Sequence, residues 1–228
     1  MQTILLLHGA IGAADQLEPL AAELSTSYKV YIMNFSGHGG TPMPIDQAFS
    51  IEMFAADVVD FMVINNLEKV SVFGYSMGGY VAMYLALHHP EKIHKIITLA
   101  TKFHWDSDIA AKEVKMLDAS KIKLKLPAFA DILKARHAPN DWEAILAKTT
   151  EMLTAIGADN VLKMADYFKI SPQCMLLVGD RDKMVTIEET IAVYRSTPNA
   201  QFAVLPGTAH PIEQVNIDML SYFIRKML

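Results

Sequence analysis

Residues 70–89, VSVFGYSMGGYVAMYLALHH, decide the fold of this chain. The run VSVFGY is short and apolar, as in a buried strand, and the segment that starts at Tyr80 has the pattern of a helix. Between them lies a sharp turn with glycines on either side of a serine. A strand that passes directly into a helix indicates a sheet in which strands and helices alternate along the chain.

The rest of the chain repeats this alternation. Near-continuous apolar runs, which suit strands covered on both faces, lie at 3–7, 29–33, 70–74, 95–99, 175–179 and 201–205. Helical patterns lie between them, at roughly 15–25, 51–65, 77–88, 187–195 and 212–227. With right-handed crossovers, this order predicts an α/β fold with a mostly parallel, doubly wound sheet.

One segment, 103–168, breaks the alternation. It contains helical patterns and no clear strand, and it is longer than a single crossover needs. We predict that 103–168 is a helical lid or cap insertion and that 1–102 and 169–228 form the core. The insertion would cover the C-terminal edge of the sheet, where ligands bind in such folds. Ordinary packing helices are the alternative, and its charged residues, Lys112 and Glu113 among them, are interpreted as a solvated helix face.

The composition excludes several classes of function. Twenty Lys and Arg residues against 25 Asp and Glu residues give a net charge of −5, and the absence of a basic stripe argues against nucleic-acid binding. We expect no targeting segment and no membrane helix, and the single cysteine, Cys174, suits a reducing compartment. The expectation is a cytoplasmic protein with a small-molecule substrate, no membrane or nucleic-acid partner, and a monomeric or homodimeric state.

The turn in the opening stretch matches G-x-S-x-G between a predicted strand and a predicted helix. Its residues are Gly74-Tyr75-Ser76-Met77-Gly78. The strained serine needs small residues two positions before and after it, and glycine fills both positions. Ser76 Oγ would project above the sheet edge, and the Met77 N–H would point to where an oxyanion develops. The motif predicts a nucleophilic serine, with a glycine-rich turn without chemistry as the alternative.

A serine hydroxyl needs a base that removes its proton. Two later loops, Gly179-Asp180-Arg181-Asp182 and Gly207-Thr208-Ala209-His210, each follow a predicted strand. His210 would take the Ser76 proton, and Asp182 would orient and stabilise the imidazole, in the chain order Ser, Asp, His. Asp180 competes for the carboxylate role, and the residues alone leave that choice open.

The other histidines receive lesser roles. His38, in the turn SGHGG, is a candidate for shaping the mouth of the site. A structural role at a helix end is expected for His88 and His89. Surface positions are expected for His94 and His137.

With these motifs in place, the chain resembles the α/β-hydrolase superfamily over nearly its whole length. The resemblance implies a compact α/β-hydrolase fold, selects Asp182 through the family's G-x-x-D and selects His210 through G-x-x-H. It also implies an oxyanion hole formed by the N–H groups of Ala10, which follows the pair His8-Gly9, and Met77. Two departures from the family are noted: residues 34–41 lack its usual acid and arginine, and its first hairpin is expected to be missing.

The superfamily includes esterases, thioesterases, amidases, carbon–carbon hydrolases and lyases, whereas members with an Asp nucleophile are excluded by the serine. No metal-ligand pattern or nucleotide-binding loop is present, so we predict no metal and no cofactor. Phe103, His104 and Trp105, at the start of the predicted lid, are candidates for substrate binding. Further apolar candidates from the same segment are Met116, Leu117, Leu124, Phe129, Ile132 and Leu133.

The predicted function is hydrolysis of carboxylic esters with small to medium, mainly apolar acyl groups, through an acyl-enzyme intermediate. Two alternatives remain. The same triad could act as a thioesterase, a carbon–carbon bond hydrolase or a lyase, or the chain could be a non-catalytic small-molecule receptor, because fold alone does not determine function.

Overall fold

The computed structural model describes all 228 residues. Its centre is one six-stranded sheet in the order β2-β1-β3-β4-β5-β6, and every neighbouring pair of strands is parallel. The strands are β1 (Thr3–Leu7), β2 (Lys29–Met33), β3 (Val70–Tyr75), β4 (Ile93–Leu99), β5 (Gln173–Gly179) and β6 (Ala200–Leu205). The predicted mostly parallel sheet is thus confirmed, and each predicted strand lies within two residues of its observed bounds.

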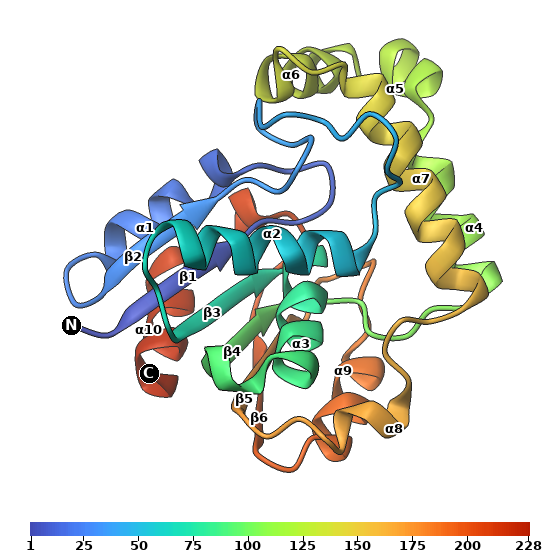
Figure 1. The fold of residues 1–228 in the computed structure, drawn as a ribbon. Coiled ribbons are helices and arrows are strands. Elements are labelled where there is room, and N and C mark those ends of the chain that lie inside the picture. The colour runs from blue at the N-terminus through green and yellow to red at the C-terminus, as the bar shows by residue number, and fades with distance from the viewer.

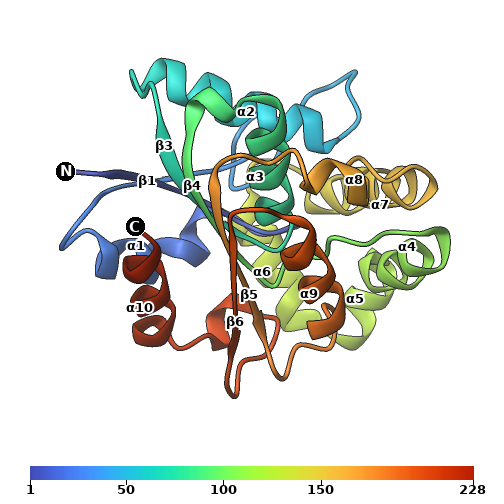
Figure 2. The same ribbon diagram turned by 90° about the horizontal axis from the view of Figure 1, so that it is seen from below.

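Helices cover both faces of the sheet (Figures 1 and 2). One face packs against α1 (Glu18–Leu24) and α10 (Ile217–Met227), and the other against α2 (Ile51–Ile64), α3 (Met77–His88) and α9 (Ile187–Ser196). Two of the predicted helices begin with short 3-10 turns, at Ala14–Leu17 and Ile212–Gln214. None of the helices has the length and apolar character that crossing a membrane requires.

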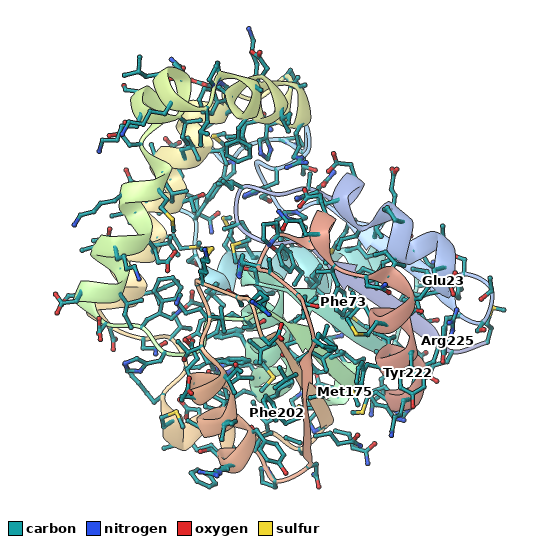
Figure 3. All side chains as sticks on the ribbon, turned by 180° about the vertical axis from the view of Figure 1, so that it is seen from behind. Glu23, Phe73, Met175, Phe202, Tyr222 and Arg225 are labelled. Atoms are coloured by element: carbon teal, nitrogen blue, oxygen red, sulfur yellow. The ribbon has the colours of Figure 1, made fainter.

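Burial follows from this layered arrangement. All six residues of β3 are buried, because helices lie on both sides of the central strands. On the α1/α10 face, Phe73 and Met175 belong to one apolar cluster. At the rim of that face, Arg225 of α10 donates a hydrogen bond of 2.6 Å to the carboxylate of Glu23, the last but one residue of α1 (Figure 3).

Residues 103–168 form five helices and no strand. These are α4 (Ser107–Val114), α5 (Ala119–Lys125), α6 (Pro127–His137), α7 (Trp142–Ala158) and α8 (Met164–Tyr167). The segment leaves the sheet after β4 and returns at β5, and these two strands pair directly. In Figure 1, α4 lies along α7, with α5 and α6 at the far end of α7. The sequence pattern did not show where this segment divides into separate helices. The divisions are made by Asp118 and Asp141, which cap the N-termini of α5 and α7, and by Pro127, which begins α6.

The loop between β2 and α2 joins this helical segment to the sheet. It passes beside α6 and α7 in Figure 1. Asn140, in the turn between those two helices, donates hydrogen bonds to the carbonyl oxygens of Gly37 at 3.0 Å and Thr41 at 2.7 Å. Lys148 of α7 donates to the carbonyl of Gln47 at 2.8 Å. These contacts fix one end of the helical segment to the core.

Close packing between α3 and the end of β1 depends on Gly78. A Cβ at this position would lie 2.5 Å from the Leu7 carbonyl oxygen and 2.6 Å from the His8 carbonyl oxygen. Both neighbours are backbone atoms of the central sheet region, so moving them would cost substantial free energy.

We therefore expect Gly78→Ala to lower the free energy of unfolding by about 3 kcal/mol, the upper range for overpacking. The matched control is Gly207→Ala, where no atom lies within 4 Å of the added Cβ and only the backbone φ of +63° is unfavourable. That strain costs about 1 kcal/mol. Urea denaturation measures both variants, and equal losses would contradict the packing argument.

Candidate active site

Four loops bring the predicted site residues to one edge of the sheet. Ala10 follows β1, Ser76 follows β3, Asp182 follows β5 and His210 follows β6. All four lie beyond the C-terminal ends of parallel strands. The strand order reverses between the neighbours β1 and β3, and a crevice opens for ligands at such a switch point.

Ser76 occupies a strained backbone position between β3 and α3. Its φ of 52° and ψ of −118° are unfavourable for a residue with a side chain. Neighbouring elements hold it there. Its N–H donates to the Leu99 carbonyl at 2.9 Å, and Thr101 Oγ1 donates to the Ser76 carbonyl at 3.1 Å. The strain is thus maintained by β4 and by the loop that follows it.

Ser76, His210 and Asp182 form a hydrogen-bonded line. His210 Nδ1 donates to Asp182 Oδ2 at 2.8 Å, which leaves Nε2 as an acceptor 3.4 Å from Ser76 Oγ. The longer distance is common in the absence of substrate. Asp182 Oδ1 accepts hydrogen bonds from the N–H groups of Met184 at 2.8 Å and Val185 at 2.9 Å.

The surroundings of Asp182 keep it ionised although its side chain is inaccessible to solvent. Burial alone would raise the pKa of this carboxyl. The hydrogen bond and the charge of His210, together with the N–H groups of Val185 and Met184, outweigh burial and lower the pKa below its ordinary value. A permanent negative charge therefore faces the His210 ring.

Asp180 lies apart from this line. Its Oδ1 accepts a hydrogen bond from the Thr208 N–H at 3.2 Å, within the loop that carries His210. The Tyr75 hydroxyl fixes the same loop by donating to the His210 carbonyl at 3.0 Å. Asp180 and Tyr75 therefore hold the backbone of the histidine loop, and Asp182 is the carboxylate that contacts the imidazole.

Two backbone N–H groups near Ser76 have no acceptor within the protein. Neither the Ala10 N–H nor the Met77 N–H donates a hydrogen bond, and both residues line the same pocket as Ser76 and His210. Ala10 belongs to a tight turn that the Gly12 N–H closes on the Gly9 carbonyl at 3.1 Å. Two such donors beside a serine form a suitable site for an oxyanion.

The pocket has a volume of about 530 Å³, its solvent-filled mouth included, and ten of its 14 lining residues are hydrophobic. Its apolar walls come mainly from the helical segment and from the loop after β5. These side chains are Trp105, Met152, Leu153, Ile156, Met184 and Val185. A wall of this kind favours apolar substrate groups.

The substrate-binding residues expected from the sequence are only partly found here. Trp105 lines the pocket. Phe103 instead packs in the core, edge-on to Tyr167. His104 is largely exposed and lies 3.6 Å from Asp106.

The further apolar candidates of the segment do not line the pocket either. Leu133, with Leu117 and Phe129, packs in a separate small cluster around Trp142. The others, Met116, Leu124 and Ile132, are exposed. The wall residues of the helical segment are instead Trp105 and, from α7, Met152, Leu153 and Ile156.

A buried ion pair in the pocket wall was also missed. Lys102 Nζ lies 3.5 Å from Glu113 and 4.0 Å from Glu189 and donates to the Met184 carbonyl. The side chains of Lys102 and Glu113 are only 12% and 7% exposed. The interpretation of Glu113 as part of a solvated face is therefore wrong, because α4 turns this residue inward to Lys102.

The chain is similar to proteins named as esterases or lipases. The chain is 31% identical over 98 residues to a pimeloyl-[acyl-carrier protein] methyl ester esterase from Aeromonas hydrophila, which covers 43% of this chain and 37% of that protein. It is 22% identical to Lipase 3 from a Moraxella species over 92% of this chain and 71% of that protein.

The fold is also that of a solved structure, a thermophilic esterase from Thermogutta terrifontis. The TM-score is 0.78 at 21% identity, over 100% of this chain and 90% of that one. The model of the alpha/beta hydrolase fold family matches residues 2–141, more than half of the chain. This protein therefore belongs to the alpha/beta hydrolase fold family.

Proposed function

We propose that this α/β hydrolase is a serine carboxylic-ester hydrolase that works through an acyl-enzyme intermediate. The observation that carries the proposal is the hydrogen-bonded line of Ser76, His210 and Asp182 at a mainly apolar pocket. The relatives named as an ester esterase and a lipase support the same class of bond.

In the first half of the reaction, Ser76 Oγ attacks the ester carbonyl while His210 Nε2 takes the hydroxyl proton. The imidazolium is stabilised by the ionised Asp182. The carbonyl oxygen becomes negative and accepts hydrogen bonds from the free N–H groups of Ala10 and Met77. One such donor contributes about 3 kcal/mol to stabilising the transition state.

Collapse of this intermediate breaks the bond to the alcohol, which leaves with the proton from His210. The acid part of the ester stays bound to Ser76 Oγ. His210 Nε2 then removes a proton from water, and the resulting hydroxide attacks the carbonyl carbon of the acyl-enzyme, whose carbonyl oxygen becomes negative in the same oxyanion site. The acid is released, and Ser76 recovers its proton from His210.

The proposed substrate is an ester with a small to medium, mainly apolar acyl group. The proposed domain division assigns the chemistry to the core, 1–102 and 169–228, and much of the pocket wall to the helical lid, 103–168. Trp105, Met152, Leu153 and Ile156 all come from that segment and line the pocket beside Ser76.

The first prediction from the proposed function concerns acyl length. Across p-nitrophenyl esters from acetate to decanoate, we expect kcat/KM to reach a maximum at roughly four to eight acyl carbons, because the apolar pocket is of modest size. Initial rates of p-nitrophenolate release measure this. An absence of turnover with every ester, together with labelling of Ser76 by a fluorophosphonate, would favour a thioester or carbon–carbon bond as the true target.

The second prediction concerns the nucleophile. Ser76→Ala should abolish both ester turnover and covalent labelling by a fluorophosphonate, because no other hydroxyl contacts the His210 ring. Mass spectrometry of the intact protein measures the adduct. Labelling that persists in Ser76→Ala would remove Ser76 from the mechanism.

The third prediction separates the two acids. Asp182→Asn should lower kcat by about 10³- to 10⁴-fold, since the amide no longer holds the required tautomer of His210. Asp180→Asn should lower kcat less than about tenfold, since it affects only the bond to the Thr208 N–H and the exposed contact with Arg181, neither of which reaches the imidazole. Steady-state kinetics of both variants give the comparison, and equal losses would refute the assignment of Asp182.

A further inference from the structure

His137, the last residue of α6, links the helical segment to two loops of the core. The sequence analysis placed it on the surface, but only 1% of it is exposed. Its Nε2–H donates to the Ile11 carbonyl at 3.0 Å, and its Nδ1 accepts from the Gly39 N–H at 3.2 Å. Both ring nitrogens are therefore used by backbone groups more than 90 residues away in the chain.

One of those loops is the turn that carries Ala10. Ile11, directly after Ala10, has a φ of 52°, which is unfavourable for a β-branched residue. Such a conformation persists only where neighbouring groups maintain it. His8 holds the start of this turn, because its Nδ1 forms a hydrogen bond of 2.8 Å with the Gly9 carbonyl. On the other side of Ala10, His137 holds the Ile11 carbonyl.

The end of α6 is itself fixed in place. Beside His137, Arg136 lies 3.4 Å from Asp15 in the 3-10 turn before α1 and 3.7 Å from Glu213 in the 3-10 turn after the His210 loop. The Asn140 side chain donates a hydrogen bond to the Gly37 carbonyl, in the loop that also contains Gly39. These contacts join the end of α6, and with it His137, to three segments of the core.

We propose that His137 is a positioning residue for the hydrolysis proposed above, on which this inference rests. It holds the peptide unit between Ile11 and Gly12, two units after the one that carries the Ala10 N–H, and so fixes the turn in which the Ala10 N–H faces the developing oxyanion. The helical segment therefore contributes to the oxyanion hole as well as to the pocket wall, although it supplies neither of the two donors.

This role requires the neutral ring, because a protonated ring cannot accept from the Gly39 N–H. Burial lowers the pKa of His137 below its ordinary value, against a bond to the Ile11 carbonyl that raises it. Arg136 lowers this pKa further and Asp15 raises it. The other titratable groups near the ring are His8 and His38, and Glu213 contacts the neighbouring Arg136.

The test removes the two hydrogen bonds of His137 in two ways. His137→Ala removes the ring, and His137→Phe keeps an aromatic ring in the buried space but has no polar atom. For both, we expect kcat for a p-nitrophenyl ester to fall about 10- to 100-fold with KM changed less than about twofold, because a misplaced donor weakens only the transition state. The Phe variant keeps the test valid where the Ala variant does not fold.

Leu133→Ala is the matched control. Leu133 lies on the same helix and is equally buried, and its small cluster with Trp142 packs against the Ile11 side chain, but Leu133 has no polar side-chain atom that could bond the backbone of the Ala10 turn. It should lower the melting temperature and leave kcat of the folded protein unchanged. A kcat loss in Leu133→Ala equal to that of His137→Phe, or a wild-type kcat in His137→Phe, would overturn the positioning role.

A second measurement separates this inference from the proposed function. Phenylboronic acid forms a tetrahedral adduct with an activated serine, and its oxygen occupies the oxyanion site. In the wild type, NMR should show a downfield shift of the Ala10 N–H on adduct formation, and His137→Phe should lose most of that shift. The same shift in both proteins overturns the inference. A wild type that gives the shift but hydrolyses no ester overturns only the proposed substrate.

Discussion

The geometry of the active site depends on the strained backbone of Ser76. A positive φ at a residue with a side chain is unfavourable, and here it is held by β4 through the Leu99 carbonyl and by the Thr101 hydroxyl. It also needs α3 to begin against the carbonyl groups at the end of β1, which Gly78 permits. Three neighbouring strands must therefore be paired before the serine takes its geometry. The active site is in this sense a property of the assembled sheet.

Much of this was predictable because its causes are local in sequence. Apolar runs bounded by turns mark the strands, and Gly74 reflects a steric demand within five residues, because a Cβ there would meet the backbone of Gly78 and Gly79. Asp182 and His210 follow strands, so their common edge could be inferred from topology. The choice between Asp180 and Asp182 needed either the family resemblance or the structure, since both lie in one turn and differ only in which group each contacts.

The helical segment was less predictable, because its contacts join distant parts of the chain. Apolar residues at helical spacing indicate that a helix face is buried, but they do not identify the element against which it packs. The pattern could not distinguish Met152 and Ile156, which line the pocket, from Leu133, which packs against Trp142. Polar residues misled for the same reason. Glu113 and His137 look like surface residues until their partners, Lys102 and the backbone of two core loops, are known.

The place where the helical segment enters the fold has a consequence for how such enzymes diverge. It leaves from β4 and returns to β5, which are direct neighbours in the sheet, so its two ends need no long connection. Insertions, deletions and repacking there can reshape the cavity while the strand register stays the same. Mutations that change substrate preference and mutations that change the catalytic chemistry can therefore accumulate at different rates within one chain. The contacts of His137 and Asn140 are the exception, because a mutation there affects both the helical segment and the core loops that these two residues bind.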